Sequence, residues 1–595
     1  MSQKPAVSER SICAKPGKDG RPQFDASLTS CRQTDVVKLV VRTEVLPVIF
    51  VPGIMGSNLR SNDATKTPVW RLDALFGQPA GLATTMYTKN AGARQKLLHP
   101  DRTEVDPDGA VAADARGIGN AKAIRARGWG EVAQTSYGEF LMWLEQTLNP
   151  EELNPALWPG YHGDDPRLPW SVVSADGKLK MVPGRRMQMQ GQPFAAELKP
   201  FEALTTDDLI RRSKLWMPVH AVGYNWLASN QDAAELVLQP AIKRIIRRYN
   251  EGAFNCQQVV MVTHSMGGLV ARACAQLPGM AKQIAGVVHG VMPAAGAAVA
   301  YRRCKIGMAD EGDYGAAKVI GYSGKEVTAV FAQAPGALQL LPSKDYPARW
   351  LAVSQNGVPP QTWPQSDPYT EIYGVRDKWW GLVKEEWLSP KGGMPITWGI
   401  YEKNLSLAKE FHEQLSRKYH PNTYVFYGAD EKQRSFERIS WKMFPGRGPV
   451  HGKRPDFREV LALSPQQVRM DGVTPEYVDG EPQASVLSSP EGGYAESVLG
   501  SHWELHCAKQ DGSGDGTVPA SSGRSPRERG GAHVRQQFGL TGFAHEPAFQ
   551  DPTAQRATLY AITRIAAGAI APANGVAAAS VSAAPTAPKK AKALR

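Results

Sequence analysis

Cysteines are scarce in this 595-residue chain, and their spacing carries no pattern. Six cysteines in so long a sequence are too few for a disulfide framework, and none has the spacing of metal ligands. Whether Cys13 pairs with Cys31, or any other cysteine is bonded, stays open at this point. We therefore expect no metal site and no cofactor.

Membrane spans and export signals are also missing. The most apolar stretch, Ile284 to Ala300, is short, rich in Gly and Ala, and interrupted by His289. It is better interpreted as a buried strand at 284–288 followed by a loop and a helix. The N-terminus has no apolar core of the kind found in signal peptides. We expect synthesis in the cytoplasm, with export only by a route that needs no cleaved signal.

The charge balance is basic but carries no nucleic-acid motif. Lys and Arg number 69 against 57 Asp and Glu, which gives a net charge of +12. Part of the excess lies in the two ends of the chain, where basic residues usually serve solubility. Attraction to anionic lipid headgroups is the alternative. Nucleic acid is not an expected partner.

One stretch, Cys256 to Arg272, combines a strand, a sharp turn and a helix. Val259 to Val262 is a β-branched apolar run typical of a buried parallel strand, and a helical pattern begins at Leu269. Between them, Thr263-His-Ser-Met-Gly-Gly268 resembles a nucleophile elbow, with threonine where the usual G-x-S-x-G pattern has its first glycine. The alternative is a serine that caps the helix. The flanking strand and helix favour Ser265 as a nucleophile.

Strands and helices alternate along most of the chain. Apolar runs predict strands at 46–51, 216–224, 284–288 and 422–427, and amphipathic patterns predict helices at 137–148, 233–249, 401–419 and 553–567. This alternation, with polar blocks at the connections, predicts an α/β fold: a doubly wound, mostly parallel sheet with large cap insertions. The active site of such a sheet lies at the carboxyl ends of its strands.

Shifts in composition divide the chain into a core and inserted blocks. We expect an N-terminal arm (1–45), a hydrolase-like core (46–74, 205–304, 401–430 and 498–570), an insertion (75–204), a cap or lid insertion (305–400), a further insertion (431–497) and a disordered tail (571–595). The cap insertion is rich in tryptophan. Ordinary cap packing explains this best, and a lid that opens at a lipid interface is the sharper alternative.

A serine nucleophile needs an imidazole to take its proton and an acid to orient that imidazole. In this fold the order along the chain is serine, acid, histidine. His545 stands in a loop before the C-terminal helix, where the fold presents its base. His533, in a glycine- and arginine-rich loop, is less favoured. His264 adjoins Ser265 but is interpreted as a packing residue.

Three aspartates are candidates for the acid. Asp515 lies in a tight turn, Gly514-Asp-Gly-Thr-Val-Pro519. Asp430 follows the strand ending at Tyr427, another place where the fold can put its acid. Asp511 is interpreted as a turn residue. We favour Asp515 over Asp430.

Backbone N–H groups must stabilise the negative charge of a tetrahedral intermediate. Met266, directly after the nucleophile, is one expected donor. Ile54 or Met55, in the loop after the strand at 46–51, should supply the other. Gly53 and Gly56 let that backbone turn toward the substrate.

Four motifs together resemble the lecithin–cholesterol acyltransferase-like and GPI inositol-deacylase-like lipases. They are Pro52-Gly-Ile-Met-Gly-Ser-Asn-Leu59, Thr263-His-Ser-Met-Gly-Gly268, Gly514-Asp-Gly-Thr-Val-Pro519 and His545. The resemblance covers about half of the chain and implies an α/β-hydrolase that acts on lipid esters. In that family the aspartate of the Gly-Asp-Gly-Thr-Val motif is the triad acid, which supports Asp515.

The size, the missing signal peptide and the long insertions also resemble bacterial lipase effectors of the type VI secretion system. That resemblance implies a phospholipase toxin delivered to the periplasm of a target cell. Its partners would be a phospholipid or membrane surface, an immunity protein and the secretion apparatus. Two alternatives stay open: an acyltransferase with the same triad, and a catalytically silent binding protein with a hydrolase fold.

Overall fold

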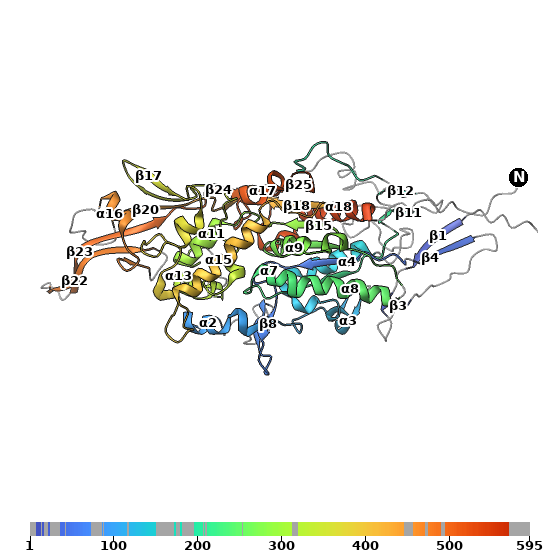
Figure 1. Ribbon diagram of the computed structural model, residues 1–595, viewed down its shortest axis with the longest axis horizontal. Helices are drawn as coiled ribbons and strands as arrows, with labels where there is room; N and C mark the ends of the chain where they lie inside the picture. The colour runs from blue at the N-terminus through green and yellow to red at the C-terminus, as the bar shows by residue number, and fades with distance from the viewer. Residues whose placement is uncertain are drawn as a thin grey trace, which may run out of the picture.

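The computed structural model describes most of the chain. The described residues are 7–12, 15–16, 22–23, 36–41, 43–72, 86, 88–115, 118–149, 172–173, 179–180, 195–205, 208, 211–212, 214–252, 254–311, 319–445, 456–470, 474–488 and 494–569. Cys13, Cys31 and the predicted tail at 571–595 lie outside them. The molecule is elongated, with the strand pairs β1–β4 (Val7–Ile12, Val36–Val41) and β22–β23 (Glu476–Ser488, Tyr494–Cys507) near opposite ends (Figure 1).

A six-stranded, fully parallel sheet forms the core. Its order is β13 (Val219–Ala221), β5 (Val48–Val51), β14 (Val259–His264), β15 (Ile284–Gly290), β18 (Thr423–Gly428) and β25 (Val534–Leu540). Every neighbouring pair runs parallel. The α/β-hydrolase fold class predicted from the sequence is confirmed.

Side chains of the central strands alternate between two apolar cores, one on each face of the sheet. Ile49 and Met261 belong to the core that includes α9 (Gly267–Gln276) and the buried face of α8 (Gln239–Glu251). Phe50 and Val262 belong to the other core, with α4 (Gln134–Leu148) and α18 (Pro552–Ala569). Burial on both faces explains why these strands are continuous apolar runs.

Two of the predicted elements differ from those observed, and a proline lies where each observed element begins. The strand expected at 216–224 is confined to Val219–Ala221, directly after Pro218, which lacks an N–H for the ladder. The helix expected at 233–249 begins as a π-helix, η5 (Ala233–Leu238), before it continues as α8. Pro240 stands in the first turn of α8 and cannot donate a helical hydrogen bond, so the preceding turn widens.

Strand β25 was not predicted. Its sequence, Val-Arg-Gln-Gln-Phe-Gly-Leu, is polar, and Gln536 and Gln537 are nevertheless buried. The amide of Gln536 bonds both the N–H and the carbonyl of Leu198, and that of Gln537 bonds Glu197. A distant segment therefore pairs with both amide groups of Gln536 and with the amide nitrogen of Gln537, so polar side chains are accommodated in a buried strand.

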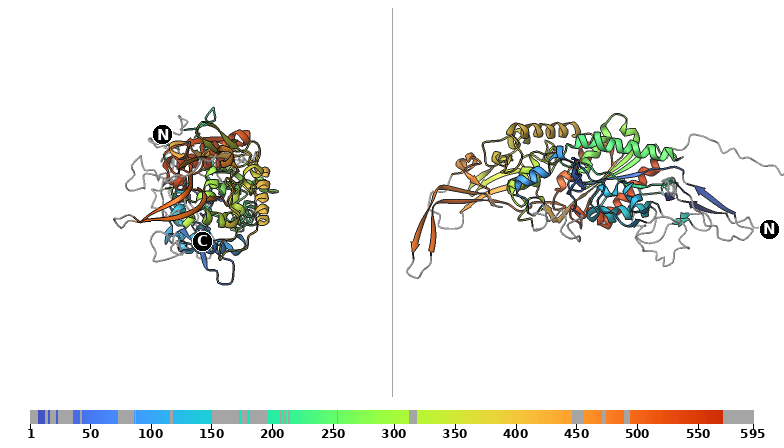
Figure 2. Two further views of the ribbon diagram at one scale, coloured as in Figure 1. Left: turned by 90° about the vertical axis from the view of Figure 1, so that its left-hand side faces the viewer. Right: turned by 90° about the horizontal axis from the view of Figure 1, so that it is seen from below.

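A second six-stranded sheet lies beside the core. Its order is β17 (Val358–Trp363), β16 (Leu351–Gln355), β20 (Ile439–Pro445), β23, β22 and β21 (Val468–Arg469), and only β16 and β20 pair in parallel. The ranges predicted as two insertions, 305–400 and 431–497, both contribute strands to it. The hairpin β22–β23 extends beyond the body of the molecule (Figure 2).

The tryptophans of the predicted cap pack inward. Trp350, Trp379, Trp380, Trp387 and Trp398 are all buried. Partly buried Trp363 stacks on Trp380 with ring centroids 4.2 Å apart. In this conformation the indoles stabilise the cap by packing. Among the described residues, none of the helices is both long and apolar enough to cross a membrane.

Candidate active site

Ser265 lies in a strained turn between β14 and α9. Its φ is +50°, a conformation that non-glycine residues rarely adopt. A Cβ at Gly267 would lie 2.4 Å from the carbonyl oxygen of Pro52, so only glycine fits where the helix crosses β5. Thr263, at the position of the missing glycine, is fully buried, and its hydroxyl bonds His289 Nδ1 at 2.9 Å. The threonine is therefore compatible with the elbow.

The structure brings Ser265, His545 and Asp515 together in one hydrogen-bonded chain. His545 Nε2 lies 2.9 Å from Ser265 Oγ, and His545 Nδ1 lies 2.8 Å from Asp515 Oδ2. Asp515 is 1% exposed, and its Oδ1 accepts the N–H groups of Thr517 and Val518. Because a carboxylate accepts, His545 carries its proton on Nδ1, and Nε2 faces the serine hydroxyl.

The less favoured candidates are bonded elsewhere. Asp430 accepts the backbone N–H groups of Lys432 and Gly542, which lower the pKa of its carboxyl. Asp511 accepts the N–H groups of residues 437 and 438, as a turn residue does. His533 precedes β25, whereas His545 follows it. Since parallel strands end at one edge of the sheet, only His545 lies on the side of Ser265.

The loop after β5 packs directly against the nucleophile. A Cβ at Gly53 would lie 3.0 Å from Ser265 Cβ. The Gly56 N–H closes a turn on the Gly53 carbonyl at 3.1 Å, and Met55 holds a φ of +64°, where such a turn normally has glycine. The indole N–H of Trp70 donates to the Met55 carbonyl at 2.7 Å and fixes this peptide. Trp70 ends β7 (Pro68–Trp70), which pairs with β6 (Leu59–Ser61).

Three N–H groups near Ser265 are available for a substrate. Within the described part of the chain, those of Ile54, Met55 and Met266 have no backbone acceptor. Met266 is the N-cap residue of α9, at the end of the helix where N–H groups lack intrahelical partners. These are the positions that the sequence indicates for stabilising an oxyanion.

Sequence reasoning missed Tyr137 and underestimated His264. The Tyr137 hydroxyl lies 2.9 Å from His264 Nδ1, and His264 Nε2 lies 3.0 Å from the carbonyl oxygen of His545. His264 is buried, as a packing residue would be, but it also holds the backbone of His545. Tyr137 is 127 positions from His264, and no sequence pattern links the two.

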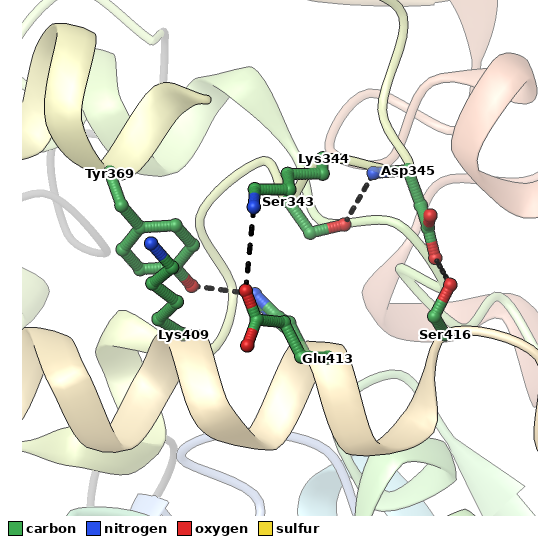
Figure 3. Close-up of a pocket in the computed structure, with 8 residues that line it drawn as sticks. Ser343, Lys344, Asp345, Tyr369, Lys409, Glu413 and Ser416 are labelled. Carbon is green, nitrogen blue, oxygen red and sulfur yellow. Dashed lines mark hydrogen bonds and ion pairs between the residues drawn. The ribbon is translucent and has the colours of Figure 1, made fainter. Parts of the chain in front are cut away.

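A separate pocket of about 210 Å³, here called the cap pocket, lies between the loop at 343–345 and η6 (Tyr369–Tyr373) of the predicted cap and α15 (Trp398–Leu415), which continues into the predicted core (Figure 3). Its charged groups are paired: Lys344 with Glu413 at 3.4 Å within the pocket, and Lys409 with Asp367 at 2.9 Å and Asp345 with Arg529 outside it. None of the triad candidates lines it. Among the residues with described positions, no cluster of three or more His, Cys, Asp or Glu is placed to hold a metal ion.

A six-stranded parallel sheet with a serine at a strand-to-helix elbow defines the class of this protein, an α/β-hydrolase. Residues 180–306 match the family model PGAP1, the PGAP1-like alpha/beta domain. The chain is therefore similar to this domain over residues 180–306, and the resemblance predicted from its motifs is confirmed.

The chain is also similar to solved structures. A chain in the crystal structure of the Tle4–Tli4 complex aligns with a TM-score of 0.64 and 28% identity, over 88% of this chain and 99% of that one. Phospholipase PlaB from Legionella pneumophila aligns over 49% of this chain and 80% of its own, at 10% identity and a TM-score of 0.14, too low to support an argument. No curated protein matches.

Proposed function

We propose that this protein is a serine hydrolase that cleaves carboxylic ester bonds of lipids, and specifically a phospholipase. The observation that carries the proposal is the hydrogen-bonded chain from Ser265 through His545 to buried Asp515 at the elbow. His545 Nε2 takes the proton of Ser265 Oγ as the oxygen attacks the ester carbonyl, and Asp515 stabilises the resulting imidazolium. The imidazolium then protonates the leaving alcohol, and water hydrolyses the acyl-enzyme by the same route.

The oxyanion of each tetrahedral intermediate binds backbone N–H groups in this proposal. Met266 supplies one donor, and Ile54 or Met55 supplies the second. The support is that these groups lack backbone acceptors within the described chain, that Met266 adjoins Ser265, and that Gly53, at the start of the loop with Ile54 and Met55, packs against Ser265. The left-handed turn at Met55 holds its peptide before substrate arrives, so no reorganisation is needed during the reaction.

A lipid substrate is supported by the PGAP1-like domain and by the motifs of the lipase families. We further propose that the chain acts as a toxin exported by a type VI secretion system and neutralised by an immunity protein. The support is the match to a chain that was solved as one member of the Tle4–Tli4 complex. Within this proposal, the substrate is a phospholipid at the membrane surface of a target cell.

The test compares the wild type with Ser265→Ala and Asp430→Asn on phospholipid vesicles, with release of free fatty acid as the readout. Ser265→Ala should lose activity on the order of a million-fold. Asp430→Asn is the matched control: it alters a carboxylate near the site that does not contact His545, and it should keep wild-type activity. A wild type that is inactive on vesicles and on soluble esters would contradict the proposal.

A further inference from the structure

A buried tyrosine–histidine pair lies under the candidate triad and is not used by the proposed mechanism. Tyr137 comes from α4 and is 3% exposed, and His264 ends β14 and is 4% exposed. The two side chains contact each other at the 2.9 Å bond between Tyr137 Oη and His264 Nδ1. Aromatic rings surround them: Phe50 lies 4.8 Å from Tyr137, centroid to centroid, and Phe549 lies 5.9 Å from His264.

The direction of every hydrogen bond in this pair follows from the atoms involved. The His545 carbonyl can only accept, so His264 Nε2 carries the proton and donates to it. Burial lowers the pKa of His264 to about 3, so the ring is neutral and its Nδ1 is an acceptor. The Tyr137 hydroxyl therefore donates to Nδ1. The Tyr137 oxygen in turn accepts the Gly53 N–H at 3.3 Å.

The two ends of this chain of hydrogen bonds reach two parts of the proposed site, the oxyanion loop and the backbone of the base. One end is Gly53, which opens the oxyanion loop and packs against Ser265. The other end is the backbone of His545, whose imidazole faces the nucleophile. Two glycines make room for the chain: a Cβ would lie 2.8 Å from His264 Nδ1 at Gly53, and 2.6 Å from the Tyr137 hydroxyl at Gly56.

We infer that Tyr137 and His264 are positioning residues that fix the oxyanion loop and the His545 backbone at one separation across the elbow. The inference rests on the proposed function. Neither side chain contacts a reacting atom, because their polar atoms are occupied by Gly53, by each other and by the His545 carbonyl. Their effect is on the geometry in which Ser265, His545 and the N–H donors meet the substrate.

The competing explanation is that this is an ordinary satisfied core histidine. Buried histidines elsewhere in the chain also have hydroxyl partners, as His220 has Tyr249 at 2.8 Å. The partly buried His412 repeats the same order of groups: Tyr369 Oη lies 2.7 Å from His412 Nδ1, and His412 Nε2 lies 2.8 Å from the Gln339 carbonyl. That pair lines the cap pocket, which none of the triad candidates lines, and provides a matched control.

The experiment compares Tyr137→Phe with Tyr369→Phe in the full chain. Each variant removes one hydroxyl from one tyrosine–histidine–carbonyl chain. We measure Tm, kcat and KM on a soluble short-chain ester, and the rate at which a fluorophosphonate labels Ser265. Tyr137→Phe should lower kcat and the labelling rate about 10- to 100-fold with KM nearly unchanged. Tyr369→Phe should leave both rates at the wild-type level with a comparable change in Tm.

If Tyr137→Phe does not fold, a second pair of variants tests whether His264 positions the His545 backbone. His264→Gln keeps an N–H that can reach the His545 carbonyl, whereas His264→Leu does not, so the glutamine variant should retain the higher kcat. Equal kcat in both overturns the inference. A Tyr137→Phe variant with wild-type kcat also overturns the inference. The same holds if Tyr369→Phe lowers kcat as much as Tyr137→Phe does. A wild type that is neither active nor labelled overturns the proposed function itself.

Discussion

Two regions of this molecule hold the same kinds of side chain and connect them differently. At the edge of the parallel sheet, a serine, a histidine and an aspartate form one chain, Ser265–His545–Asp515. In the cap pocket, Ser416 donates instead to Asp345 at 2.6 Å, and His412 is occupied by Tyr369 and by a backbone carbonyl. No imidazole faces a serine among these cap residues. Residue types alone therefore do not define a site, and the hydrogen-bond partners of the histidine distinguish the two regions.

Replacing the serine of each region gives the largest expected contrast. Ser265→Ala should lower turnover on the order of a million-fold, because the attacking oxygen is lost. Ser416→Ala removes a hydroxyl that contacts a carboxylate, so turnover should stay within about threefold of wild type. Fatty-acid release from vesicles measures both. A large loss of turnover in Ser416→Ala would contradict the assignment of the reaction to the edge of the parallel sheet.

Replacing the aspartate of each region should give a smaller contrast. Asp515→Asn should lower kcat about 10⁴-fold, because an amide no longer holds His545 in the tautomer that presents a free Nε2. Asp345→Asn should leave kcat nearly unchanged, although it weakens the ion pair with Arg529. Steady-state kinetics on a soluble ester test both. A mild effect of Asp515→Asn would return Asp430 to consideration as the acid.

Lowering the pH should reduce the stability of the fold by a similar amount through each of the two tyrosine–histidine pairs. Burial lowers the pKa of His264 to about 3 and that of His412 to about 4. In the unfolded chain both histidines have the ordinary pKa of about 6.5. Below that pH they are protonated in the unfolded chain but stay neutral in the folded chain. The stability that the two neutral histidines contribute is therefore fully present above pH 6.5 and is lost progressively as the pH falls below that value. At pH 5 each histidine should lower the free energy of unfolding by about 2 kcal/mol relative to pH 7.5.

Urea unfolding of wild type, His264→Gln and His412→Gln at both pH values measures this loss. Each variant should show a smaller difference between pH 7.5 and pH 5 than the wild type, by a similar amount. The opposite result is a variant with the same change in the free energy of unfolding between pH 7.5 and pH 5 as the wild type. That result would show that the replaced histidine is protonated in the folded wild type as well.

The parts of the site that adjoin each other in sequence were predictable. The apolar run at 259–262 and the glycines after Ser265 report a strand, a turn and a helix that are in local contact. The order of Ser265, Asp515 and His545 along the chain then follows from the parallel sheet, whose strands all end at one edge. In the structure these three side chains lie together at that edge, as their order along the chain suggests.

What was missed depends on contacts between distant segments. Polar β25 is held in the sheet by side-chain bonds to residues 197 and 198. The second sheet pairs strands whose neighbours lie far away in sequence, as β16 and β20 do. Tyr137 stands in a helix with an ordinary apolar pattern, and only the fold shows that its hydroxyl reaches His264. Local periodicity carries no information of this kind.

The bond from Trp70 to the Met55 carbonyl has a consequence for inhibitors. A non-glycine residue in the left-handed region costs on the order of 1–3 kcal/mol and persists only where its surroundings enforce it. Here the enforcement comes from the small sheet that contains β7, which is separate from the strand bearing the nucleophile. In the proposed mechanism, a compound that mimics the tetrahedral intermediate would therefore owe part of its affinity to an indole that it never touches.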